Sequence, residues 1–241
     1  MTISVLVPAY NEAAGLAAAL ASIRGAMTAF TDRGWDTELV VCDNNSTDAT
    51  PAIAAAAGAR VVFEPVNQIS RARNAAAAVA RGEWLVFVDA DTHPSAALFA
   101  DAADAIASGR YLAGGSVVRM ESSTRFGDAV VSLWNATSRL TRWAAGAFIF
   151  VETAAFRAVG GFSERLYASE EIALCRGLKR LGRGQGRRLV ILRRHPVRTS
   201  GRKLQLYTPL EMLGLLARTA LTGGRTLRRP RDLFLWYDGR R

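Results

Sequence analysis

The feature that most constrains the fold is an apolar run that ends in two carboxylates. Residues 84–88 (Trp-Leu-Val-Phe-Val) are all apolar, and Asp89 and Asp91 follow directly. A continuous apolar run without polar alternation predicts a strand that is covered on both faces of a sheet. In open α/β sheets, ligands bind beyond the carboxyl ends of the strands. We therefore expect Asp89 and Asp91 to lie in a ligand-binding crevice.

The spacing of these two aspartates indicates a divalent-metal site. Carboxylates this close repel each other and raise one another's pKa unless a cation lies between them. Hard oxygen ligands that act together with diphosphate oxygens suit Mg²⁺ or Mn²⁺. The alternative is a pair of solvated loop aspartates, because Asp is common in turns.

The first 88 residues alternate between strand-like and helix-like segments. Strands are predicted at 3–8, 38–43, 60–63 and 84–88, and helices at 11–30, from about Pro51 to Gly58, and at 68–81. We interpret Asn11 as the cap of the first helix. Successive β-α units predict an α/β fold with a parallel central sheet and helices on both faces.

The pattern after Asp91 is looser. Helices are expected at 94–108, 124–143, 170–181 and 209–221, and strands at 114–120, 147–151 and 189–192. There is no internal repeat or low-complexity linker that would mark a boundary before about residue 195. We therefore expect one catalytic domain over 1–200, and a basic helical extension of the same domain over 201–241.

Charge divides the chain in a similar way. Residues 1–175 hold 13 Lys and Arg against 18 Asp and Glu, whereas residues 176–241 hold 18 against 3. Such asymmetry suggests that the basic end meets phosphates, lipid headgroups or nucleic acid, with general solubility as the alternative. No apolar run reaches the ~18 residues of a spanning helix, and no signal peptide opens the chain. We expect a cytoplasmic protein in which Cys42 and Cys175 are buried, reduced thiols.

Six motifs in this order resemble the family 2 glycosyltransferases, and the resemblance covers about residues 1–200. The motifs are Val7-Pro8-Ala9-Tyr10-Asn11-Glu12, Asp43-Asn44-Asn45-Ser46-Thr47-Asp48, Arg73-Asn74, Asp89-Ala90-Asp91, Gly160-Gly161-Phe162 and Glu170-Glu171. The resemblance implies a GT-A type fold with a Rossmann-like, mostly parallel sheet. It also implies a UDP- or GDP-sugar donor, Mg²⁺ or Mn²⁺, and inverting transfer to an acceptor hydroxyl.

The same resemblance implies the nucleotide site. The residues expected at the base and ribose are Pro8, Ala9, Tyr10, Asn11, Glu12 and Asp43. Arg73 is expected to contact the nucleotide, whereas Arg71 is interpreted as facing solvent. Amides at the start of the first helix are expected to face an anion.

The resemblance also implies the catalytic groups. Asp91 is the expected principal metal ligand, and Asp89 the ligand of the ribose or of the metal's water shell. His195 resembles a late histidine that reaches the metal or the diphosphate, with an ordinary loop residue as the alternative. Glu171 is the expected base, but the family usually carries Asp there, and the extra methylene leaves Glu170 as an alternative base.

Two other functions remain open from the sequence. A nucleotidyltransferase would also join an Asp pair to a metal and a nucleotide, although residues 8–16 contain no Lys and only Gly15. A nucleic-acid-binding protein is disfavoured by the acidic body, and we expect no nucleic-acid partner. The end of the chain is interpreted either as packing on the body or in a homodimer, or as a peripheral anchor on the anionic inner face of a membrane. The sequence identifies neither the sugar nor the acceptor.

Overall fold

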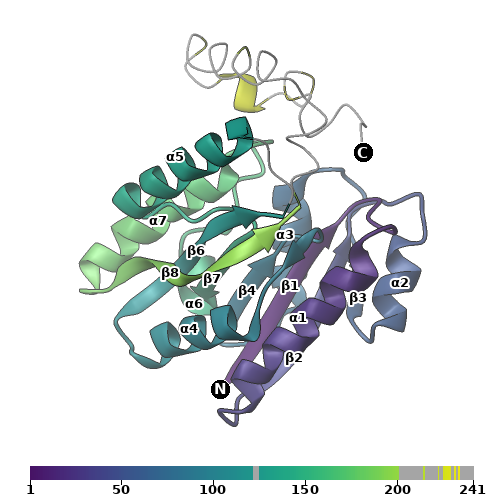
Figure 1. Ribbon diagram of the computed structural model, residues 1–241, viewed down its shortest axis with the longest axis horizontal. Coiled ribbons are helices and arrows are strands. Elements are labelled where there is room, and N and C mark those ends of the chain that lie inside the picture. The colour runs from purple at the N-terminus through teal and green to yellow at the C-terminus, as the bar shows by residue number, and fades with distance from the viewer. Residues whose placement is uncertain are drawn as a thin grey trace.

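The computed structural model describes residues 1–121 and 125–200, together with positions 214, 222, 225–228, 231 and 233. Within these residues an eight-stranded sheet runs through the middle of the molecule, with helices on both faces (Figure 1). The helix expected at 209–221 lies outside the described residues, apart from Gly214.

The first half of the chain builds the parallel part of the sheet. Strands β1 (Thr2–Ala9), β2 (Asp36–Asp43), β3 (Arg60–Phe63) and β4 (Trp84–Val88) stand in the order β3-β2-β1-β4, and each adjacent pair is parallel. The connecting helices are α1 (Leu16–Thr31), α2 (Thr50–Ala56) and α3 (Ile69–Val79). All five residues of β4 are buried. This arrangement confirms the predicted run of β-α units and the doubly covered central strand.

The second half turns the sheet into a mixed one. Strand β7 (Phe148–Glu152) is antiparallel to β4 and to β6 (Tyr111–Met120), whereas β8 (Arg188–Thr199) runs parallel to β6. The two-residue strand β5 (Thr92–His93) closes the order as an antiparallel partner of β8. The remaining helices are α4 (Ala96–Ala107), α5 (Arg125–Thr141), α6 (Thr153–Ala158) and α7 (Glu170–Gly184), and the 3-10 turn η1 spans Arg225–Arg228. The sheet is therefore mostly, but not wholly, parallel.

Each face of the sheet has its own hydrophobic core. On one face α1 and α4 bury Leu20, Phe30 and Phe99 against the strands. On the other face α3, α6 and α7 bury residues that include Phe156 and Leu178. Cys42 and Cys175 belong to this second core and are both buried and free, as predicted. Helices on both faces are what the continuous apolar strands require.

Helix α5 supports the end of β6 by means of one side chain. Strand β7 pairs with β6 only over Ala113–Gly115. Beyond that point Asn135 of α5 accepts a hydrogen bond from the Val118 amide at 2.9 Å and donates one to the Val118 carbonyl at 2.9 Å. The side-chain amide thereby satisfies backbone groups that a neighbouring strand would otherwise satisfy, and β6 continues to Met120.

Several element boundaries differ from the sequence expectations, and two of them concern the candidate site. Helix α1 begins at Leu16, not near Asn11, because Asn11 is left-handed (φ 49°) and its side chain bonds the loop after β2. Strand β8 extends to Thr199 because β6 and β5 both pair with it. His195 therefore lies inside a strand. Pro196 falls at a register irregularity between β6 and β8, where a missing amide hydrogen is tolerated.

Described residues near the end of the chain contact the body. The Tyr167 amide donates to the Leu227 carbonyl at 2.7 Å, and Leu233 is buried beside Ala168. Of the helices in the described ranges, none combines the length and the apolarity needed to cross a bilayer.

Candidate active site

The loops after β1 and β2 hold each other in place. Asn11 Oδ1 accepts from the Thr47 amide at 2.7 Å, and the Asn11 amide donates to Ser46 Oγ at 2.9 Å. The amides of Glu12 and Ala13 donate to Thr50 Oγ1 and Asp48 Oδ2. These amides were expected to face a bound anion. The structure corrects that expectation, because side chains of the neighbouring loop already accept their hydrogens.

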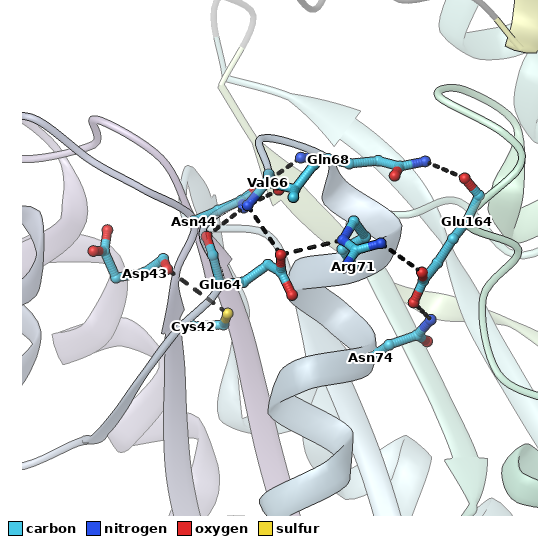
Figure 2. A network of polar contacts seen from close by, with 9 residues as sticks. All are labelled: Cys42, Asp43, Asn44, Glu64, Val66, Gln68, Arg71, Asn74 and Glu164. Carbon is cyan, nitrogen blue, oxygen red and sulfur yellow. Dashed lines mark hydrogen bonds and ion pairs between the residues drawn. The ribbon is translucent and has the colours of Figure 1, made fainter.

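The residues expected at the nucleotide differ in how accessible they are. Pro8 and Ala9 are the last two residues of β1 and are buried, so that their side chains lie beneath the surface of the site. Tyr10, Asn11 and Glu12 are half-buried. Asp43 ends β2 and is 5% exposed, with Oδ1 accepting from the Ser46 amide at 3.1 Å. Figure 2 shows the Asp43 carboxylate pointing away from the neighbouring polar network around Asn44.

That network joins β2, β3 and α3 through Asn44 (Figure 2). The Asn44 side chain donates to the carbonyls of Glu64 and Val66 at 3.1 and 2.6 Å, and it accepts from the Gln68 amide at 2.9 Å. Gln68 then donates to the carbonyls of Glu164 and Leu166. The loop before α7 is thereby tied to the end of β2.

Arg71 is a member of the same network. The sequence had suggested that it simply faces solvent. Its Nε donates to Glu64 at 3.1 Å, and its Nη1 donates to Glu164 at 2.9 Å. Arg71 thus bridges two carboxylates that lie 100 positions apart in the sequence. Periodicity identified the helix, but it could not identify these partners.

Arg73, two residues further along α3, is the electrostatic centre of the site. It is 1% exposed, and its guanidinium donates to Glu170 Oε1 at 2.6 Å and to Asp89 Oδ1 at 2.8 Å. Burial alone would lower its pKa, but the charges of Asp89, Glu170 and Glu171 outweigh burial and raise it. Arg73 was expected to touch the nucleotide. That contact stays a prediction, and in the structure Arg73 is buried and positions carboxylates from β4 and α7.

Gly146 makes room for this arginine, and the Gly160-Gly161-Phe162 loop places a ring against it. Arg73 donates to the Gly146 carbonyl at 3.2 Å, and a Cβ at Gly146 would lie 2.7 Å from its Nη2. Gly161 has φ 69°, and the Phe162 ring that follows lies 5.1 Å from the guanidinium carbon. Asn74 holds Phe162 by bonds to its backbone N–H and C=O, at 3.0 and 2.9 Å. The Arg73-Asn74 and Gly160-Gly161-Phe162 motifs therefore form one structural unit.

The two glutamates at the start of α7 have different environments. Glu170 is 4% exposed and is engaged with Arg73. Glu171 is half-buried, and among the described residues no salt bridge involves it. Burial of its carboxylate, followed by the charge of Glu170, raises the pKa of Glu171 to about 8, although Arg73 acts in the opposite direction. Glu171 is therefore the carboxylate that can exchange a proton near neutral pH.

The aspartates after β4 are held by different parts of the chain. Asp89 is fixed by Arg73, whereas Asp91 Oδ2 accepts from Ser200 Oγ at 2.6 Å and Oδ1 lies 3.5 Å from Thr199 Oγ1. His195 Nδ1 lies 2.9 Å from Asp101 Oδ2 of α4, and among the described residues no hydrogen bond or ion pair joins it to Asp91. In the described ranges, no three His, Cys, Asp or Glu side chains form a metal-binding group. A metal here would need oxygens from a ligand as well as from Asp91.

The match to known proteins agrees with this geometry. A sequence model described as glycosyl transferase family 2 matches residues 4–159, which cover β1 from Ser4 onwards, β2 to β7 and both aspartates. The chain belongs to glycosyl transferase family 2.

Solved structures support the fold of this family 2 chain. A mannosyltransferase from Pyrobaculum calidifontis, solved with GDP-Man and Mn²⁺, superposes with a TM-score of 0.67 at 22% identity, covering 82% of this chain and 56% of that one. S. aureus TarS 1-349 with UDP-GlcNAc gives 0.65 at 22% identity, covering 84% and 59%. These neighbours carry the GT-A fold, which confirms the expected fold class.

A further relative is a TPR repeat-containing protein of Synechococcus elongatus. It is 47% identical over 55 residues, which is 22% of this chain and 14% of that protein. The chain thus spans less than two thirds of the length of each of these three proteins.

Proposed function

We propose that this chain transfers a sugar from a UDP- or GDP-sugar to an acceptor hydroxyl, with inversion by a single displacement and with a divalent metal. The observation that carries the proposal is the Arg73 ion-pair cluster, which holds the end of β4 and the start of α7 together. Asp91 and Glu171, which lie next to these two carboxylates in the sequence, would thereby share one site. The neighbours solved with UDP-GlcNAc and with GDP-Man and Mn²⁺ support this class of donor.

Asp91 would hold Mg²⁺ or Mn²⁺, with Asp89 beside it. The donor set fits, because Mg²⁺ is commonly bound by one or two carboxylates together with substrate phosphates. Asp91 accepts hydrogen bonds from hydroxyls and has no ion-pair partner in the described residues, so its charge is available. When bound, the metal neutralises charge on the departing diphosphate. His195 as a further ligand stays a prediction, and its contact with Asp101 gives it a second role.

Glu171 would act as the general base that takes the proton of the acceptor hydroxyl. Glu170 is engaged with Arg73 and is better placed to position that arginine than to move a proton. A base with a raised pKa accepts a proton more readily, and catalysis of this type contributes about 10²- to 10⁴-fold. The chemistry needs one carboxylate for the proton and none to form a sugar adduct.

On the donor side, Tyr10, Asn11, Glu12 and Asp43 would line the nucleotide. The interlocked loops fix these residues before the donor arrives, so that little ordering is needed on binding. We also propose that residues 1–200 form the catalytic domain and that 201–241 extend it and return to it at Tyr167. Peripheral contact with an anionic membrane and homodimerisation remain predictions, which vesicle co-sedimentation at low and high salt and light scattering would test.

A panel of UDP- and GDP-sugars, assayed with and without Mn²⁺ for hydrolysis or transfer, tests the function. We expect metal-dependent release of nucleoside diphosphate from at least one donor. Release of pyrophosphate from a nucleoside triphosphate would instead show a nucleotidyltransferase. Binding to nucleic acid without turnover of any donor would show a binding protein.

A further inference from the structure

Two arginines from neighbouring strands line one open hollow beside the candidate site. Arg119 of β6 and Arg198 of β8 are register partners, so that their side chains leave the same face of the sheet. With Met120 and Glu121 they line a hollow of about 360 Å³. Both arginines are exposed.

The charges that the described residues bring to this hollow do not balance. Like charges directly opposite each other on neighbouring strands are destabilising. Among the described residues of the lining, Glu121 supplies one carboxylate against two guanidinium groups, a net charge of +1. In the part of the chain that the structure describes, no hydrogen bond or ion pair engages the guanidinium of Arg119 or of Arg198. An anion that entered the hollow would relieve the repulsion.

Strand register relates the hollow to the metal-binding aspartate. Arg198 precedes Ser200, whose hydroxyl bonds Asp91, by two residues. Residues two apart in an extended chain lie about 6.6 Å from each other, so that the hollow lies close to Asp91. The hollow lies at the β6-β8-β5 end of the sheet order, whereas the residues proposed for the nucleotide follow β1 and β2 towards the other end. A group bound there would reach the site from the side opposite to the nucleotide.

We propose that Arg119 and Arg198 bind an anionic group, a phosphate or a carboxylate, on the acceptor substrate. Guanidinium forks match such planar or tetrahedral oxyanions and form short, charge-assisted hydrogen bonds. The inference rests on the proposed function, because it takes Asp91 to mark the place where the diphosphate of the donor binds. It narrows the acceptor to hydroxyl compounds that carry a negative charge.

Calorimetry with inorganic phosphate as the probe tests the site. The full chain is first saturated with UDP or GDP and Mg²⁺, so that the donor site is filled, and phosphate is then titrated. We expect the double variant Arg119→Gln/Arg198→Gln to bind phosphate at least ~10-fold more weakly than the wild type, since a charged hydrogen bond contributes ~1.5–3 kcal/mol. Arg188→Gln, an exposed arginine at the other end of β8, should bind phosphate as the wild type does.

The outcomes separate the two proposals. Unchanged phosphate affinity in the double variant overturns the anion site, as does a loss of nucleotide affinity in that variant, which would assign the arginines to the donor diphosphate. Phosphate binding that depends on both arginines in a chain that binds no nucleotide would uphold the anion site and contradict the proposed function. With an active donor, the double variant should raise KM for anionic acceptors at least ~10-fold and leave KM for neutral ones unchanged.

Discussion

Arg73 and Arg198 both lie close to the aspartates after β4, yet their surroundings are opposite. Arg73 is 1% exposed and bonds two carboxylates, whereas Arg198 is exposed and, among the described residues, bonds none through its side chain. The same contrast holds for the loops around them. The loops after β1 and β2 are joined by reciprocal hydrogen bonds, while the ends of β6 and β8 leave an open, charged hollow.

Under the two proposals above, this difference would allow one scaffold to serve two ligands. On the donor side, the protein satisfies its own polar groups and fixes the site in advance, which reduces the cost of orienting a ligand. On the other side, unsatisfied charge is left for a ligand to neutralise. This contrast indicates a rigid half that would bind the nucleotide-sugar donor and an adaptable half that would bind the acceptor.

The largest expected effect comes from removing the charge that holds the donor side together. Arg73→Met leaves Asp89 and Glu170 without their cation, and breaking a buried ion pair in this way costs about 3–5 kcal/mol. The free energy of unfolding, measured in urea, should fall by that amount. Arg71→Met, on the same helix but more exposed, is the matched control and should lose much less. Equal losses in the two variants would show that burial does not distinguish these arginines.

The next effect concerns catalysis. Glu171→Gln should lower turnover at least ~10²-fold with donor affinity intact, because the variant cannot take the acceptor proton. Glu170→Gln, which keeps an oxygen for Arg73, should lose less. If Glu170→Gln lost turnover and Glu171→Gln did not, the two roles would be reversed.

The pH dependence gives the same residue a second test. The pKa of Glu171 is raised to about 8, so the carboxylate that acts as the base forms only as the pH approaches this value. Wild-type turnover should therefore rise with pH through that region. Between the unfolded pKa near 4.5 and this folded value, the folded chain binds more protons than the unfolded chain, so stability should fall as pH rises. Glu171→Gln should remove this fall in Tm. A wild-type Tm that rises over the same interval would contradict the assignment.

The order of strands and helices was predictable from the sequence, whereas most contacts between side chains were not. The apolar run before Asp89 fixed the central strand, and the strand and helix order followed from periodicity and from residues such as Pro51 and Gly58. The ion-pair partners of Arg71 and Arg73 could not be predicted from periodicity, because most of them lie on distant segments of the chain. Asn11 illustrates the reason: it was interpreted as the cap of the first helix, but that helix begins at Leu16 and the Asn11 side chain accepts from the Thr47 amide across the site.

The smallest expected effect sharpens the role of the interlocked loops. Ser46→Ala removes the acceptor of the Asn11 amide and should cost about 1 kcal/mol of stability. Ser22→Ala removes a similar bond, from Ser22 Oγ to the Pro94 carbonyl, away from the nucleotide loops. Both variants should lose similar stability, but Ser46→Ala alone should weaken nucleotide binding. Equal nucleotide affinity in the two variants would mean that the loop contacts serve folding only.

The central claim is that Asp91 brings a metal to the diphosphate of a nucleotide sugar, and calorimetry tests it directly. UDP and GDP are titrated into the wild type, Asp91→Asn and the control Asp104→Asn, an exposed aspartate of α4 that pairs with Arg33, each with and without Mn²⁺. We expect Mn²⁺ to tighten nucleotide binding in the wild type and in Asp104→Asn, and to have no effect in Asp91→Asn. Binding that Mn²⁺ enhances equally in all three proteins would contradict the account.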